Sequence, residues 1–269
     1  MTAAVKAVRE WFDVVIKQSL ETIAKRQASQ KPSDEEPIKS IVEMFFENSS
    51  EDKSGLRSDD LVDFLLSFVF AAQDTTVLTL TRFFLALADH PEVEKRVREE
   101  MKAVLPTLGV DRDTCLTADH AQHLTYLEAT IREVLRLYPT EPATQRIAAE
   151  DTIICGDVQI KKNDQIGLSM YAMARNPSVW GPDAAEFKPE RWVDKSGSLR
   201  VEPPTRFATF GAGPRQCIGM KLAQLEIRVV AANLLHQYEF ALAAPNNRDY
   251  LVGITLMLKE PLMMKVKRA

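Results

Sequence analysis

Apolar residues recur at helical spacing along most of the first two-thirds of the chain, and this pattern predicts a mainly helical protein. Five helices are expected, at Thr2–Arg26, Ser58–Asp89, Pro91–Val104, Ala118–Leu137 and Met220–His236. Ser58 is placed to cap the second helix, and Pro91 suits the first turn of the third. A short apolar segment, Ile38–Phe46, lies between two polar stretches that predict exposed loops, Gln27–Glu36 and Glu47–Gly55.

The pattern changes after Pro139. Short alternating runs over Ala143–Leu168 predict small β-hairpins, and the last segment, Tyr238–Lys267, again looks like short strands. A short helix is expected near Ser169–Arg175. The proline-rich stretch Asn176–Thr209 has little periodicity and predicts a long functional loop. The sequence therefore predicts an α+β fold, mainly helical with small β-hairpins.

Composition narrows the class of protein only a little. The 269 residues are 45% hydrophobic and 27% charged, as in ordinary globular proteins, and a net charge of -4 gives no sign of nucleic-acid binding. Cys115, Cys155 and Cys217 lie too far apart for a disulfide framework or a C-x-x-C metal site. The four histidines have no metal-ligand spacing and are interpreted as non-ligands: His90, His120, His123 and His236.

No stretch is expected to be a signal peptide or a membrane span. The longest apolar segment, Leu61–Ala72, has about half of the ~20 residues that a span needs, and Asp63 interrupts it. The first residues predict an amphipathic helix without targeting information.

The stretch FGAGPRQCIG, residues 210–219, carries the strongest chemical signal. It places Cys217 just before a predicted helix, whose N-terminus favours the thiolate form. Gly213 and Gly219 let the main chain approach a ligand closely, and Arg215 suits a carboxylate partner. A buried structural cysteine is the alternative, but it leaves the glycines and the arginine unexplained.

This stretch fits F-x-x-G-x-R-x-C-x-G and resembles the haem-ligand loop of the cytochromes P-450. The resemblance implies a haem (iron protoporphyrin IX) with Cys217 as the axial thiolate ligand and Phe210, Gly213, Arg215 and Gly219 around the cofactor. Thiolate ligation favours O–O cleavage. The implied activity is that of a monooxygenase, which takes electrons from an NADPH-dependent reductase and inserts one oxygen atom into a C–H bond of an apolar substrate.

A second motif, AAQDTT, lies inside the long apolar helix. An Asp-Thr pair there is costly unless it has a partner or a task. The resemblance implies that Thr75 directs protons to dioxygen and that Asp74 relays them. Ala72 stands where the family usually has glycine, and its methyl group could narrow the oxygen groove. A buried helix with incidental polar residues is the alternative.

Two further motifs gain meaning from the resemblance. Glu133 and Arg136 share a helix face, which alone would be compatible with a surface pair. The resemblance instead implies a buried network with Arg191 of the PERW motif that fixes the loop before Cys217. It also implies that Arg146 contacts a haem propionate; a surface arginine on the hairpin is the alternative.

The resemblance runs along the whole chain but covers only the C-terminal half of a family member. We therefore expect residues 1–269 to form a partial domain, without the N-terminal membrane anchor, the early strands and the helices that complete the distal pocket. The chain looks most like eukaryotic microsomal fatty-acid and alkane hydroxylases, which places a full-length relative on the cytosolic face of the endoplasmic reticulum membrane. Pocket positions implied by the resemblance are Phe70, Ala71, Thr75, Ala143, Thr144, Val252 and Ile254.

Three alternatives remain open at this point. The chain could be a non-catalytic fragment that binds haem weakly or not at all. It could be a haem-thiolate peroxidase or isomerase, although Asp74 and Thr75 argue for proton delivery to dioxygen. A helical interaction protein without a cofactor would explain the helices but not the motifs.

Overall fold

A computed structural model describes residues 3–28, 58–245 and 248–269 of the chain. The chain divides into two compact units, Met1–Ala71 and Ala72–Ala269. The apolar segment Ile38–Phe46 lies outside the described residues, as do the flanking polar stretches apart from the last residues of the first helix.

The first unit holds helix α1 (Ala3–Ala28) and the start of helix α3 (Ser58–Asp89). The predicted range of α3 is confirmed, and α1 ends two residues after the predicted Arg26. The side chain of Ser58 lies outside the described side chains, so its capping role stays a prediction. The two segments pack through a small apolar cluster formed by Phe12, Ile16, Leu61, Val62 and Leu65. The Arg9 guanidinium donates to the Asp63 carboxylate beside this cluster.

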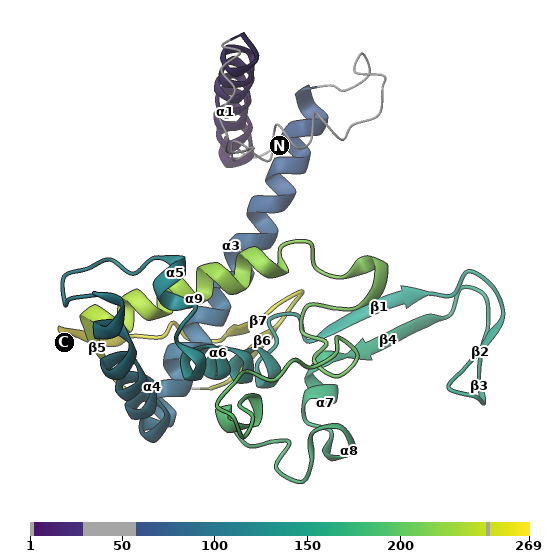
Figure 1. Ribbon diagram of the computed structural model, residues 1–269. Coiled ribbons are helices and arrows are strands. Elements are labelled where there is room, and N and C mark those ends of the chain that lie inside the picture. Colours follow the sequence, from purple (N-terminus) through teal and green to yellow (C-terminus); the bar gives the residue numbers. More distant parts are fainter. Residues whose placement is uncertain (1–2, 29–57, 246–247) are drawn as a thin grey trace. The chain divides into compact units, whose positions relative to one another are not determined.

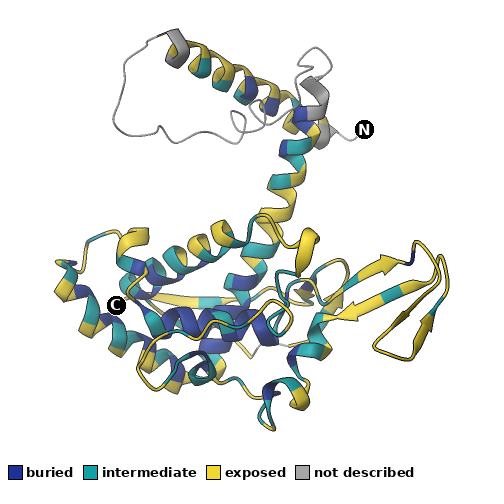
Figure 2. Cartoon of the chain, turned by 45° about the vertical axis from the view of Figure 1, so that its right-hand side comes forward, coloured by how far each residue is buried: buried dark blue, intermediate teal, exposed yellow. Residues whose placement is uncertain are grey.

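The second unit is built around helix α6 (Thr125–Leu137), in which all residues except Thr125 and Arg132 are buried. The end of α3, helix α4 (Pro91–Val104) and helix α9 (Met220–Gln237) pack around it in one hydrophobic core. Figure 2 shows α6 as the most deeply buried helix of this unit. A 3-10 turn (Leu105–Leu108) follows α4.

The predicted helix Ala118–Leu137 is wrong in one respect, because the structure breaks it into α5 (Ala118–Ala121) and α6. The Glu100 carboxylate of α4 accepts hydrogen bonds from the backbone N–H groups of Tyr126 (2.6 Å) and Leu127 (3.0 Å) and so caps α6. Burial raises the pKa of Glu100, and these hydrogen bonds oppose the shift. A cap supplied by another helix leaves no local signal in the sequence.

The strands form antiparallel two-stranded pairs, which confirms the predicted α+β class (Figure 1). The first pairs are β1 (Ala143–Ile147) with β4 (Gln165–Ser169) and β2 (Thr152–Ile154) with β3 (Val158–Ile160). The last pairs are β5 (Tyr238–Leu242) with β8 (Met264–Arg268) and β6 (Tyr250–Val252) with β7 (Leu256–Leu258). Between them lie α7 (Met170–Ala174), α8 (Pro177–Trp180) and a 3-10 turn at Pro189–Trp192, inside the predicted long loop.

One segment among the described residues, Leu61–Asp89, is long and apolar enough to cross a membrane by length and composition, and an 18-residue window within it has a mean hydropathy of 1.5. This corrects the expectation that Leu61–Ala72 is the limit of the apolar stretch. The charged side chains in this segment, such as Asp74 and Arg82, are too sparse to bring the mean hydropathy below that of a membrane-spanning segment. The last part of the same helix, Phe83–Leu87, is buried in the protein core.

Candidate functional site

The loop before α9 presents Cys217 at the surface. Its backbone N–H donates to the carbonyl of Phe210 (2.8 Å), which closes the loop on itself. Gly211 and Gly213 adopt left-handed conformations (φ 70° and 69°), which a side chain would disfavour. Gly219 ends the loop directly before the first residue of α9, so the thiol lies close to a helix N-terminus.

The surroundings of Cys217 fit the haem that the sequence predicts. The thiol is exposed, and three apolar residues that follow it along the chain are exposed as well: Ile218 (86%), Leu222 (57%) and Leu225 (38%). Apolar side chains grouped beside a soft sulfur ligand suit an apolar macrocycle with a central iron. A Cβ at position 219 would lie 3.9 Å from the Cys217 Sγ, which is ordinary van der Waals contact, so Gly219 lies directly beside the thiol.

Replacing Gly213 with alanine is expected to destabilise this loop by about 1–2 kcal/mol, because φ of 69° is costly for a residue with a β-carbon. Gly219→Ala is the matched control, since Gly219 has φ of -84° and a new Cβ would make only ordinary contact. Denaturant unfolding monitored by circular dichroism measures both. Equal midpoints for the two variants would show that the left-handed turn carries no strain.

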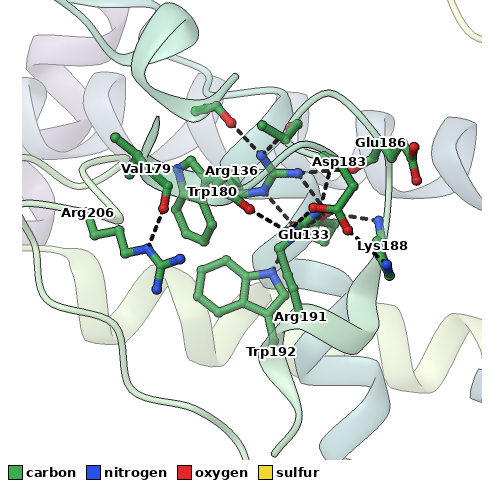
Figure 3. Close-up of polar contacts among 12 residues, drawn as sticks. Glu133, Arg136, Val179, Trp180, Asp183, Glu186, Lys188, Arg191, Trp192 and Arg206 are labelled. Carbon is green, nitrogen blue, oxygen red and sulfur yellow. Dashed lines mark hydrogen bonds and ion pairs between the residues drawn. The ribbon is translucent and has the colours of Figure 1, made fainter. Parts of the chain in front are cut away.

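A buried polar cluster is centred on the fully buried carboxylate of Glu133 (Figure 3). Arg136 binds both of its oxygens, through Nε and Nη2, at 2.7 Å each. Arg191 Nε (2.9 Å) and the backbone N–H of Lys188 (2.8 Å) donate to one oxygen, and the Trp192 indole N–H (2.9 Å) donates to the other. The structure thus brings together the three residues expected to form a network and adds two further donors.

Arg136, only 1% exposed, also holds the main chain of the long loop. Its guanidinium donates to the carbonyls of Ala184 (2.7 Å), Glu186 (3.1 Å) and Ala174. Its Cζ lies 5.0 Å from the ring centroid of Trp180. One side chain of α6 therefore orders segments about 40 to 50 residues further along the chain.

Asp183 balances the charge at the edge of the cluster. It accepts hydrogen bonds from Lys188 Nζ (2.8 Å) and Arg191 Nη1 (3.4 Å). The hydrogen bond from Lys188 is the main cause that lowers the pKa of Asp183, and the nearby Arg191 adds to the effect. Two carboxylates thus face three cations, and the buried Glu133 carboxylate has donors on both oxygens.

Aromatic rings connect this cluster to the Cys217 loop. The ring of Trp192 lies 4.8 Å from that of Phe207, which lies 6.4 Å from that of Phe210. The Thr209 hydroxyl also donates to the carbonyl of Leu135 on α6 (2.8 Å). Since Phe210 accepts the Cys217 N–H, packing and hydrogen bonds run from Glu133 to the thiol loop.

The other predicted site residues lie apart from this cluster. Arg146 is exposed on β1 and bonds only locally within the described chain, to the Thr144 hydroxyl (2.9 Å) and the Gln145 carbonyl (2.7 Å). Arg215 is exposed and has no hydrogen-bonding or ionic partner within the described residues. Asp74 is exposed and Thr75 half-buried on α3, where the Thr75 carbonyl accepts the Thr79 hydroxyl (2.8 Å).

Sequence reasoning missed Trp192, Asp183 and Phe207. Trp192 is the last residue of the PERW motif and directly follows Arg191, so its position in the sequence indicates that it lies near the network. Asp183 and Phe207 lie in the aperiodic loop, where no spacing indicates which residues turn toward α6.

Two of the cavities in the described part of the chain lie away from the predicted site residues. One, of about 280 Å³, is lined by α4, the end of α9 and Val110–Arg112. The other, of about 290 Å³, lies between α4 and the start of α6. Neither contains a predicted pocket position, and Phe70, Val252 and Ile254 are 69%, 79% and 78% exposed.

Comparison with known proteins identifies a family and several relatives. The profile of the family described as Cytochrome P450 matches residues 1–266. Cytochrome P450 94C1 from Arabidopsis thaliana is 37% identical over 71% of this chain and 38% of its own length. Alkane hydroxylase MAH1 from the same plant is 34% identical over 77% of the chain and 39% of its length. Cytochrome P450 86B1 is 27% identical over 98% of the chain and 47% of its length.

These alignments span less than half of each relative's length. The family match, which extends from residue 1 to residue 266, includes the Cys217 loop. Proteins of this family bind a thiolate-ligated haem, in agreement with the residues around Cys217. The chain belongs to the cytochrome P450 family.

Proposed function

We propose that this chain forms the haem-thiolate centre of a monooxygenase, in which the thiolate of Cys217 would hold the haem iron. The observation that carries the proposal is the exposed Cys217 thiol at the head of α9, held by its backbone hydrogen bond to Phe210 and supported by the Glu133 cluster. When bound, the haem would supply activation of dioxygen for insertion of one oxygen atom into a C–H bond.

The loop residues would hold the cofactor. Phe210, Gly213 and Gly219 shape the main chain around Cys217. Arg215 and Arg146 would bind haem propionates, since both guanidinium groups are exposed and neither is engaged by a carboxylate of the described chain. Glu133, Arg136 and Arg191 would act at a distance, by fixing the loop.

Asp74 and Thr75 would deliver protons. The reaction consumes dioxygen, two electrons from an NADPH-dependent reductase and two protons, and it yields one hydroxyl group on the substrate and one water. Asp74 is exposed to solvent and neighbours Thr75 on α3, so it could pass protons from solvent to the Thr75 hydroxyl. Ala72 lies two residues before Asp74 and three before Thr75, and its methyl group would narrow the space beside this pair.

An apolar substrate, a fatty acid or an alkane, fits the pocket positions best. Val252 and Ile254 are apolar, and one relative is named an alkane hydroxylase. By the same likeness, the whole protein would work at the cytosolic face of the endoplasmic reticulum membrane.

Turnover of dodecanoic acid by the haem-loaded chain with reductase and NADPH tests the proposal. We expect a hydroxylated acid, and for Thr75→Ala at least a tenfold lower yield of product per NADPH, as is typical for loss of a proton-transfer group. Thr75→Ser keeps the hydroxyl group and is the control.

Product formed from peroxide without reductant would favour a peroxidase. Bound haem without any turnover would favour the alternative of a non-catalytic fragment, which the many exposed apolar side chains support.

A further inference from the structure

Arg82 is a buried cation of α3 without an ionic partner in the described part of the chain. The residue is only 5% exposed, and its buried Nη2 atom has no hydrogen-bond acceptor. Desolvation lowers the pKa of this guanidinium. A charge buried in this way needs another source of stabilisation.

Tyrosine rings provide that source. The Cζ atom of Arg82 lies 4.0 Å from the ring centroid of Tyr250 and 5.8 Å from that of Tyr138. A second guanidinium, that of Arg175, lies 6.0 Å from the Tyr138 ring and 3.7 Å from the Tyr171 ring. Cations and aromatic faces therefore alternate from β6 across α3 to the ends of α6 and α7, at distances suited to cation–π attraction.

Tyr250 begins β6, so this stack attaches the β6–β7 hairpin to the helical core. A two-stranded hairpin has little stability alone and takes its position from what it packs against. Further attachments include an ion pair of Arg248 with Asp89 and a hydrogen bond from the Leu256 N–H to the Thr140 carbonyl (2.8 Å). Beyond them, Val252 and Ile254 protrude, 79% and 78% exposed.

We propose that Arg82 is a positioning residue that fixes the β6–β7 hairpin through the face of Tyr250 and thereby sets where Val252 and Ile254 meet an apolar substrate. The part of this inference that concerns the substrate rests on the proposed function. The attachment of the β6–β7 hairpin by Arg82 and Tyr250 does not depend on it. Arg82 acts through the hairpin and touches no reacting atom.

Hydrogen exchange of the Leu256 amide in the 269-residue chain reports on the attachment without turnover. Tyr250→Leu removes the aromatic face, and we expect this amide to exchange about tenfold faster, as is typical for loss of a desolvated cation–π contact. Tyr250→Phe keeps the face and should exchange as the unmodified chain does. Arg82→Met should also speed exchange at Leu256 without lowering the melting temperature, because it removes a buried Nη2 that lacks an acceptor.

Unchanged exchange at Leu256 in both Tyr250→Leu and Arg82→Met would overturn the proposal. Faster exchange throughout α6 as well would also overturn it, because it would make the stack a general stabiliser.

In the haem-loaded chain, Tyr250→Leu should shift the position at which dodecanoic acid is hydroxylated, and Tyr250→Phe should not. Absence of turnover in every variant would count against the proposed function alone, since the exchange result would stand.

Discussion

Replacing Glu133 with alanine is expected to lower the free energy of unfolding by about 3–5 kcal/mol, the usual cost of breaking a buried ion pair. The variant strands the buried guanidinium of Arg136 and leaves the Trp192 indole N–H and the Lys188 backbone N–H without their acceptor. Each buried donor left unpaired adds to the loss. Urea unfolding monitored by circular dichroism measures the effect.

Glu226→Ala is the matched control, because Glu226 is an exposed glutamate on α9. The urea midpoint of Glu226→Ala should stay close to that of the unmodified chain. The double variant Glu133→Met with Arg136→Met should cost less than the sum of the two single changes, since it removes both charges together. A Glu133→Ala variant as stable as the Glu226 control would show that the cluster does not support the fold.

The second large effect is expected at Cys217. Cys217→Ser should abolish the absorption signature of thiolate-ligated haem, because the hydroxyl of serine is a far poorer ligand for iron than a thiolate. Cys115→Ser and Cys155→Ser are matched controls, since both cysteines are exposed and lie outside the loop. Titration of each purified variant with haemin, followed at the Soret band, compares them. A thiolate signature that survives in Cys217→Ser but not in one of the others would move the ligand to that cysteine.

The periodic elements of this chain could be predicted because their signals are local. The predicted range of α9 differs from the observed one by one residue. The hairpins around Ala143–Leu168 follow from short alternating runs. The break between α5 and α6 could not be predicted, since the cap comes from Glu100 on another helix. Propensity alone favours one continuous helix there.

The candidate site shows the same division. The motif around Cys217 and the pairing of Glu133 with Arg136 were evident from spacing and resemblance. The path from Trp192 through Phe207 to Phe210 depends on how an aperiodic loop folds over α6, and no sequence period encodes that. The roles of Arg146, Asp74 and Thr75 remain predictions, because they depend on a bound cofactor and on dioxygen.

The most direct test of the central claim is a reduced, carbon-monoxide difference spectrum of the purified 269-residue chain with added haemin. The account predicts the red-shifted Soret band of thiolate-ligated haem, formed by Cys217. A band typical of histidine-ligated or free haem, or no band at all, would contradict the claim that this chain assembles the thiolate site.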